Sequence, residues 1–222
     1  MRKSLILTIL FLFALSTASY ALRPLSTDNT GTTYQGGWKV ETWLDSETLN
    51  STSTSRLGVK GKYGLTTNFE FQGAVSYQSV GGTSGRGPID LLLKYRFNEE
   101  SGTTPSFGVR GGISLPETGD STITVRALLT DTKKDFTYHT NLGLATSGSR
   151  NGIFYGGALV FQLNNDLKAM GELFGSGLTE QLFTRIGGTL RIKKNIHLDG
   201  AIKLGLSTNT PSGFTIGVSV LI

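Results

Sequence analysis

Basic side chains recur at every second position in short stretches of this chain. Arg56, Lys60 and Lys62 alternate with apolar residues and glycine in one stretch, and Glu70 alternates with phenylalanines in the next. A period of two places alternate side chains on opposite faces of a β-strand. If the polar faces of all the strands line one enclosed bore, an excess of positive charge there attracts anions and repels cations. The first chemistry that the sequence predicts is therefore electrostatic selection of a solute.

The same alternation, followed along the whole chain, assigns a larger set of charged residues to the polar face. The basic members are Lys39, Arg56, Lys60, Lys62, Lys94, Arg96, Arg110, Arg126, Lys168, Arg185, Arg191 and Lys203. The acidic members are Glu41, Asp45, Glu70, Asp90, Glu172 and Asp199. We expect these residues to line the bore and to favour neutral or anionic small solutes, aromatic acids included. The same charges could instead form salt bridges that fill a narrow barrel, so an open and a plugged bore both stay as alternatives.

Two histidines, His139 and His197, are the candidates for general-base chemistry. A hydrolase needs such a base within hydrogen-bond reach of a nucleophile and oriented by a third group. Both histidines fall on the polar face, whereas a lipid-cleaving site should face the rim of the bilayer. No Gly-x-Ser-x-Gly motif stands between a strand and a helix. We therefore expect no enzymatic activity and keep a lipid-modifying enzyme as the least favoured alternative.

Metal and cofactor chemistry also lacks its usual residues. The chain has no cysteine, and two separated histidines without clustered carboxylates lack the spacing of metal ligands. The glycine pairs, such as Gly81-Gly82, precede no helix and do not make a phosphate loop. Removing Arg2 and Lys3 with the leader lowers the formal charge from +5 to +3, too little to indicate nucleic-acid binding. We expect no metal, no cofactor and no nucleic-acid partner.

The first residues are typical of a secretory leader. Arg2 and Lys3 precede an apolar run over residues 5–14, and Ser19-Tyr20-Ala21 offers a small-residue cleavage site. The apolar run is shorter than the roughly 20 residues of a transmembrane helix. The sequence thus predicts a cleaved signal peptide over residues 1–21, a periplasmic lead-in over 22–35, which could lie below the barrel or plug it, and one β domain over 36–222.

The elements that must position the charged residues are short alternating strands. Their expected ranges are 37–45, 56–63, 68–79, 89–97, 107–115, 122–130, 136–146, 153–163, 167–174, 181–192, 196–206 and 214–222. Most are close to the roughly 9–11 residues with which a tilted strand crosses a bilayer. The sequence therefore predicts an all-β fold, a closed antiparallel up-and-down transmembrane β-barrel of about twelve strands.

Loop lengths and aromatic residues support this interpretation. Connections after even-numbered strands are mostly tight, except residues 98–106, and those after odd-numbered strands, such as 46–55, 80–88 and 207–213, are longer. Aromatic residues on the apolar face fall near strand ends, as in the girdles of membrane barrels: Trp38, Tyr63, Phe69, Tyr95, Phe97, Phe107, Phe136, Tyr138 and Phe161 at the short-turn side, and Tyr77, Tyr155 and Phe214 at the other. A soluble barrel or sandwich with its apolar face inward is the alternative.

Several segments carry a resemblance to one family in the same order along the chain. They are residues 23–32, 62–66, 90–96, 115–120 and 171–174. Together they resemble the bacterial outer-membrane transporters assigned to the MetA pathway of phenol degradation. Glu117 interrupts the usual Leu-Pro-Thr-Gly-Asp, and the chain ends in Ile222 where an aromatic residue is usual. The resemblance implies an outer-membrane barrel with a role in the uptake of small, often aromatic, compounds.

The combined expectation is an exported outer-membrane channel for passive uptake of small solutes, hydrophobic or aromatic compounds included. Its expected partners are outer-membrane lipid, the solute and, during insertion, the outer-membrane assembly machinery. Alternatives are a porin selective for acidic sugars and a structural membrane protein.

Overall fold

The computed structural model describes residues 24–222. The expected signal peptide and its cleavage site lie outside the described residues. Over the described range the chain forms strands and turns, and it contains no helix long and apolar enough to span a membrane.

Thirteen strands follow one another within residues 24–222. Their bounds are β1 Trp38–Leu49, β2 Thr52–Gly64, β3 Phe69–Val80, β4 Thr83–Arg86, β5 Ile89–Arg96, β6 Ser106–Leu115, β7 Thr122–Thr132, β8 Phe136–Ser147, β9 Arg150–Gln162, β10 Leu167–Ser176, β11 Gln181–Lys193, β12 Ile196–Gly205 and β13 Ser212–Leu221.

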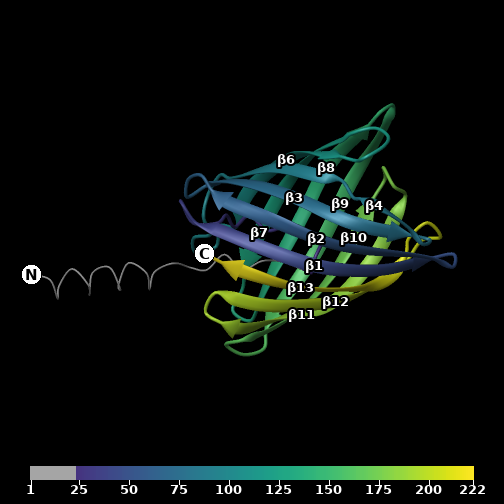
Figure 1. The fold of residues 1–222 in the computed structure, drawn as a ribbon. Helices are drawn as coiled ribbons and strands as arrows, with labels where there is room; N and C mark the ends of the chain where they lie inside the picture. The colour runs from purple at the N-terminus through teal and green to yellow at the C-terminus, as the bar shows by residue number, and fades with distance from the viewer. Residues whose placement is uncertain (1–23) are drawn as a thin grey trace, which may run out of the picture.

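The strands close into one antiparallel barrel (Figure 1). Each long strand pairs with its neighbours in sequence, and β1 pairs with β13 to join the two ends of the sheet. The short strand β4 pairs with the last residues of β3, on the edge that β5 pairs with earlier in the strand, and is not counted among the twelve strands of the ring. Because every ring strand has two neighbours, no edge is left unpaired, which is what a bilayer demands of a β protein. The predicted closed barrel of twelve strands is confirmed.

Two of the predicted long loops are largely strand. β1 and β2 extend to Leu49 and Thr52 and are joined by Asn50 and Ser51, whose φ angles of 48° and 68° are those of a tight hairpin turn. The expected loop over 46–55 is therefore wrong. β4 likewise occupies part of the expected loop over 80–88. The first segment is rich in Ser and Thr and the second in Gly, so both lack apolar alternation although Thr favours strands.

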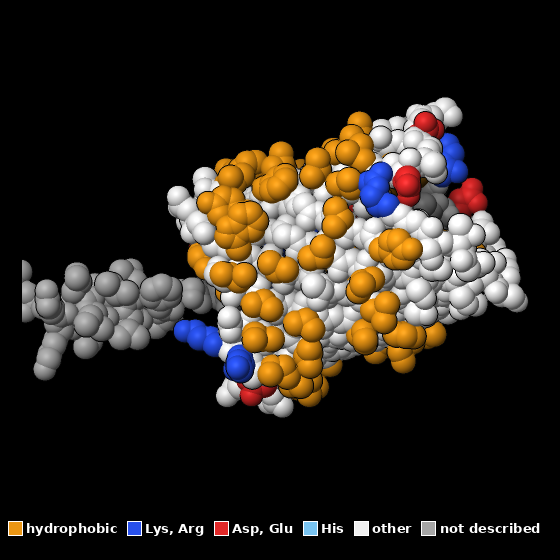
Figure 2. Space-filling model, viewed as in Figure 1, with side chains coloured by type: hydrophobic (Ala, Val, Ile, Leu, Met, Phe, Trp, Pro, Cys, Tyr) orange, Lys and Arg blue, Asp and Glu red, His pale blue; other side chains and the backbone are white. Residues whose placement is uncertain are grey.

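The barrel carries its apolar side chains outward. Leu144 and Ile186 are 65% and 64% exposed, whereas the inward Lys94 and Gln72 are 2% and 1% exposed. Apolar side chains are spread over the outer wall in Figure 2, between backbone and other side chains, and the charged groups visible there lie toward the two ends. The soluble alternative, with its apolar face inward, does not fit this arrangement.

Aromatic rings meet near the end of the barrel where the described chain ends. Trp38 and Tyr63 lie 4.7 Å apart between ring centroids, and Tyr95 meets Phe97 edge to face at 5.2 Å. Rings at this level prefer the headgroup region of a bilayer. The positions agree with the predicted girdle at the short-turn side.

Candidate functional site in the bore

Strand alternation places the predicted charged residues on the inward face of the barrel, but at different heights. Arg96 and Arg191 lie at the short-turn rim, where Arg96 contacts Glu99 at 2.7 Å and Arg191 contacts Asp166 at 2.8 Å. Arg56 lies toward the opposite end, within 3.4 Å of Gln78. The residues that gather in the middle of the bore are Lys39, Glu41, Lys60, Lys62, Glu70, Lys94, Arg110, Arg126, Glu172, Arg185 and Lys203. The remaining predicted residues, Asp45, Asp90, Lys168 and Asp199, share the inward alternation of their strands.

The lead-in runs inside the bore. Both carboxylate oxygens of Glu172 on β10 accept the Ser26 N–H, at 2.9 Å, and one of them also accepts the Thr27 N–H at 2.8 Å. Asn141 on β8 accepts the Asp28 N–H at 2.7 Å and donates to the Asp28 carbonyl at 2.8 Å. These strand side chains complete the backbone hydrogen bonding of a segment that has no strand partner of its own.

The lead-in then crosses to the opposite wall. The Thr30 N–H donates to Thr130 Oγ1 on β7 at 3.1 Å, and the Thr33 N–H donates to Glu70 on β3 at 2.6 Å. The sequence predicts a lead-in that either lies below the barrel or plugs it. Its described part lies within the barrel. Strands β3, β5, β6, β7, β8, β10 and β11 provide its contacts.

A row of charged residues runs around this wall at one level. Glu70, Lys94, Arg110 and Arg126 stand opposite one another on β3, β5, β6 and β7. Like charges directly opposite each other in a sheet repel. Asp28 of the lead-in relieves part of this repulsion, because its carboxylate lies 3.1 Å from Lys94 Nζ and 2.8 Å from an Arg110 nitrogen. The lead-in thus supplies the counter-charge that the row lacks.

Arg126 has no carboxylate partner among the described residues. One guanidinium nitrogen lies 3.4 Å from the Ser26 carbonyl, and the group rests over the Phe154 and Phe174 rings at 4.6 and 5.5 Å from their centroids. Gly143 stands between Arg126 and Phe154 in the strand register. A Cβ at Gly143 would lie 2.8 Å from Arg126 Cγ, so a side chain here would compete with the arginine for space.

A second basic group lies on β1 and β2. Glu41 is fully buried and faces three lysines, with Lys62 Nζ at 2.8 Å, Lys39 Nζ at 3.7 Å and Lys60 Nζ at 3.8 Å. One carboxylate thus serves three ammonium groups. Trp43 on the same face of β1 lies under Lys60, 5.9 Å from its ring centroid. This wall keeps a surplus of positive charge.

The third group contains aromatic rings that the charge pattern did not single out. Phe154, Phe174 and Phe183 on β9, β10 and β11 form a buried cluster with Ala145 and Leu178. Arg185 lies 3.3 Å from Glu172 and 5.3 Å from the Phe183 ring centroid. The alternation contained the signal for two of these rings, because Phe174 shares the phase of Glu172 and Phe183 that of Arg185.

The histidines are part of the polar interior. His139 is buried and its Nδ1 lies 3.0 Å from Thr130 Oγ1, the hydroxyl that also accepts the Thr30 N–H. His197 is buried on the inward face of β12. Both side chains lie on the inward face, whereas a lipid-cleaving base would face the bilayer. Over residues 24–222 no three His, Asp or Glu side chains gather as metal ligands would.

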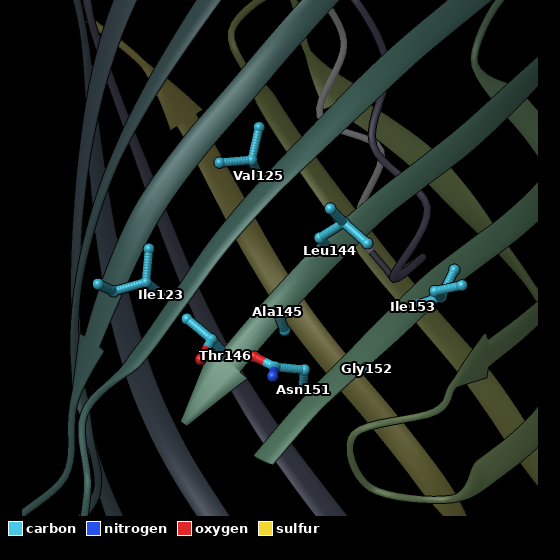
Figure 3. Close-up of a pocket in the computed structure, with 8 residues that line it drawn as sticks. All are labelled: Ile123, Val125, Leu144, Ala145, Thr146, Asn151, Gly152 and Ile153. Carbon is cyan, nitrogen blue, oxygen red and sulfur yellow. The ribbon is translucent and has the colours of Figure 1, made fainter. Parts of the chain in front are cut away.

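The groove drawn in Figure 3 lies on the outer wall. It has a volume of about 450 Å³, and its lining residues on β7, β8 and β9 are Ile123, Val125, Leu144, Ala145, Thr146, Asn151, Gly152 and Ile153. Four of these, Ile123, Val125, Leu144 and Ile153, are exposed apolar side chains. The groove therefore belongs to the outward apolar face and not to the bore.

No protein-family model and no curated protein matches the sequence. Solved structures do match. The COG4313 outer membrane channel from Pseudomonas putida F1 is similar with a TM-score of 0.68 at 13% identity, over 89% of this chain and 98% of that one.

Two porins give a similar result. The KdgM porin in complex with disordered oligogalacturonate has a TM-score of 0.64 and the NanC porin one of 0.60, each at 11% identity over 82% of this chain and 98% of its own. The fold is that of outer-membrane channel barrels. At these identities the likeness carries the fold alone, and the resemblance to the phenol-degradation family stays a prediction.

Proposed function

We propose that this protein is a channel of a bacterial outer membrane for passive uptake of small neutral or anionic solutes, aromatic acids included. The observation that carries the proposal is the surplus of positive charge in the middle of the bore. Glu41 is shared by three lysines, and Arg126 has no carboxylate partner among the described residues. In a narrow space of low dielectric constant such a surplus concentrates anions and excludes cations.

The outward apolar face and the aromatic girdle support the outer-membrane location, and the expected leader supports export. Insertion by the outer-membrane assembly machinery and contact with outer-membrane lipid follow from this location. The charged residues in the middle of the bore are packed against one another and against the lead-in, since Glu41, Glu70 and Lys94 are buried. Solute passage therefore requires the lead-in to shift.

A planar lipid bilayer across a KCl gradient tests the proposal with the mature chain. We expect a reversal potential of the sign that chloride selectivity gives. A potential of the opposite sign would contradict it. A barrel through which no solute passes, in bilayers or in liposome swelling, would favour the structural alternative.

The second candidate within transport is a channel for acidic sugars. The similar KdgM barrel is described in complex with oligogalacturonate, and a basic bore suits sugar acids as well. Liposome swelling with benzoate, galacturonate and an uncharged sugar of similar size separates the two. We expect faster entry of benzoate, because the bore combines basic groups with phenylalanine rings and a lead-in that narrows it. Faster entry of galacturonate would select the acidic-sugar channel.

A further inference from the structure

Arg126 differs from its two neighbours in the charged row. Lys94 and Arg110 share the Asp28 carboxylate, whereas Arg126 stands next in the register and forms no ion pair with an acid of the described residues. An arginine offers five N–H donors. Here Nε is buried without a hydrogen-bond partner, as it is in Arg110, and the hydrogen bond that Arg126 donates to the Ser26 carbonyl is long at 3.4 Å. Arg126 therefore retains donors for an anion.

The nearest acid is already engaged. Glu172 accepts the N–H groups of Ser26 and Thr27 and pairs with Arg185 at 3.3 Å. A carboxylate with these partners has little capacity left for a second guanidinium. The row thus keeps one positive charge that the protein itself does not neutralise, and desolvating such a charge is costly unless a counter-ion joins it.

The surroundings of Arg126 are aromatic on one side. Phe154 and Phe174 lie under its guanidinium, and Phe174 stacks on Phe183 with 5.3 Å between ring centroids. Gly143 leaves the inner surface between Arg126 and Phe154 free of a side chain. The place therefore combines one unpaired planar cation with an apolar wall of rings.

We propose that Arg126, Phe154 and Phe174 form a binding site for a small carboxylate that carries a flat apolar ring. The carboxylate accepts N–H groups of Arg126, which is the planar fork suited to it. The ring packs against the phenylalanines at the preferred offset or edge geometry. The site rests on the proposed channel function, to which it gives a ligand class and a position in the bore.

The ligand needs an apolar ring because phenylalanine rings form one side of the site. Chloride or acetate would pair with Arg126 but would itself make no contact with the phenylalanine rings. A sugar acid would bring several hydroxyl groups against rings that cannot accept their hydrogen bonds, and unpaired buried hydroxyls cost affinity. A ring carboxylate satisfies both halves of the site.

Isothermal titration of the detergent-solubilised mature barrel with benzoate, acetate and galacturonate tests the site. We expect benzoate to bind more tightly than the other two. Arg126→Gln should weaken benzoate binding at least about tenfold, since it removes a charge-assisted pair. The matched control is Arg56→Gln, which removes a bore arginine outside the cluster and should leave benzoate binding within about twofold.

A second variant examines the apolar half. Phe174→Leu keeps an apolar side chain, so the barrel should still show heat-dependent migration in SDS gels. The variant should weaken the binding of benzoate and leave the binding of acetate unchanged. Equal losses in the Arg126 and Arg56 variants, or acetate binding as tight as benzoate, would overturn the site while leaving an anion channel intact. Tight, Arg126-dependent benzoate binding by a barrel that conducts cations would support the site and overturn the channel proposal.

Discussion

Glu172 on β10 holds the Ser26 N–H with both carboxylate oxygens, each at 2.9 Å. Arg185 holds the Pro24 carbonyl just before it, and Asn141, Thr130 and Glu70 follow it along the lead-in. The lead-in has no ladder of its own, so side chains of the barrel wall determine its position. The state of the bore should therefore respond to changes in these few anchors.

Glu172→Gln should loosen the lead-in and raise the mean conductance. The amide oxygen can still accept one N–H, but it loses the charge that strengthens these bonds and the pairing with Arg185. A loss of roughly 2 kcal/mol corresponds to about thirtyfold in the ratio of displaced to docked lead-in. Single-channel recording measures this ratio.

Glu47→Gln is the matched control for this variant. It removes a carboxylate that pairs with Lys203 at 2.9 Å and has no contact with the lead-in. Its open fraction should match that of the unchanged protein. If the two variants have the same open fraction, the contact between Glu172 and the lead-in does not limit conduction.

Asp28→Asn should lower the stability of the barrel. The change leaves Lys94 and Arg110 opposite each other without their shared counter-charge, and Lys94 is almost fully buried. Breaking such a buried ion pair by removing one partner costs on the order of 3 kcal/mol. The temperature at which the barrel loses its compact migration in SDS gels should fall. Asp166→Asn, which breaks the exposed turn pair with Arg191, should change that temperature little.

An unchanged melting temperature in Asp28→Asn would mean that other groups neutralise the row. The same variant removes a negative charge and so raises the net positive charge of the bore by one, and its chloride selectivity should rise. Loss of stability together with unchanged selectivity would contradict the assignment of Asp28 to the conducting space.

Lys60→Gln should weaken anion selectivity with little effect on folding. Lys60 is the most distant of the three lysines around Glu41, at 3.8 Å, and it retains partial exposure. Removing its charge lowers the positive potential of the β1–β2 wall. The reversal potential in a KCl gradient should shift toward zero, and the shift should shrink at high salt, where charges are screened. Lys133→Gln, in the β7–β8 turn outside the bore, should leave the potential unchanged.

The strands and the faces of their side chains could be predicted from the sequence, because a period of two is a direct consequence of strand geometry. Thr48 and Ser53 show where the prediction fails. They belong to the β1–β2 hairpin beyond the apolar belt, where both faces are polar and the alternation disappears. The ends of β1 and β2 are determined by hydrogen bonds between the two strands, and the alternation of side chains does not reveal these bonds.

The inward charged set could likewise be predicted from alternation, whereas its internal arrangement could not. Asp28 stands in an irregular segment without periodicity, and its contact with Lys94 and Arg110 joins residues 66 and 82 positions away. Phe174 and Phe183 are different, since their phase was available in the pattern. They were missed because the polar face was defined by its charges and not by phase alone.

Ile186→Arg tests which face of the barrel meets hydrocarbon. Ile186 lies in the middle of β11 and points outward. An arginine on the lipid face near the midplane costs about 2–4 kcal/mol, whereas an arginine on the surface of a soluble barrel would cost little. Urea unfolding of the barrel in lipid vesicles should show a loss of that size. Leu65→Arg, in the β2–β3 turn beyond the strands, provides the control and should cost less than about 1 kcal/mol because charge near the interface is tolerated. Equal stability of the two variants would mean that β11 does not face a bilayer. That result would contradict the membrane location on which the proposed channel depends.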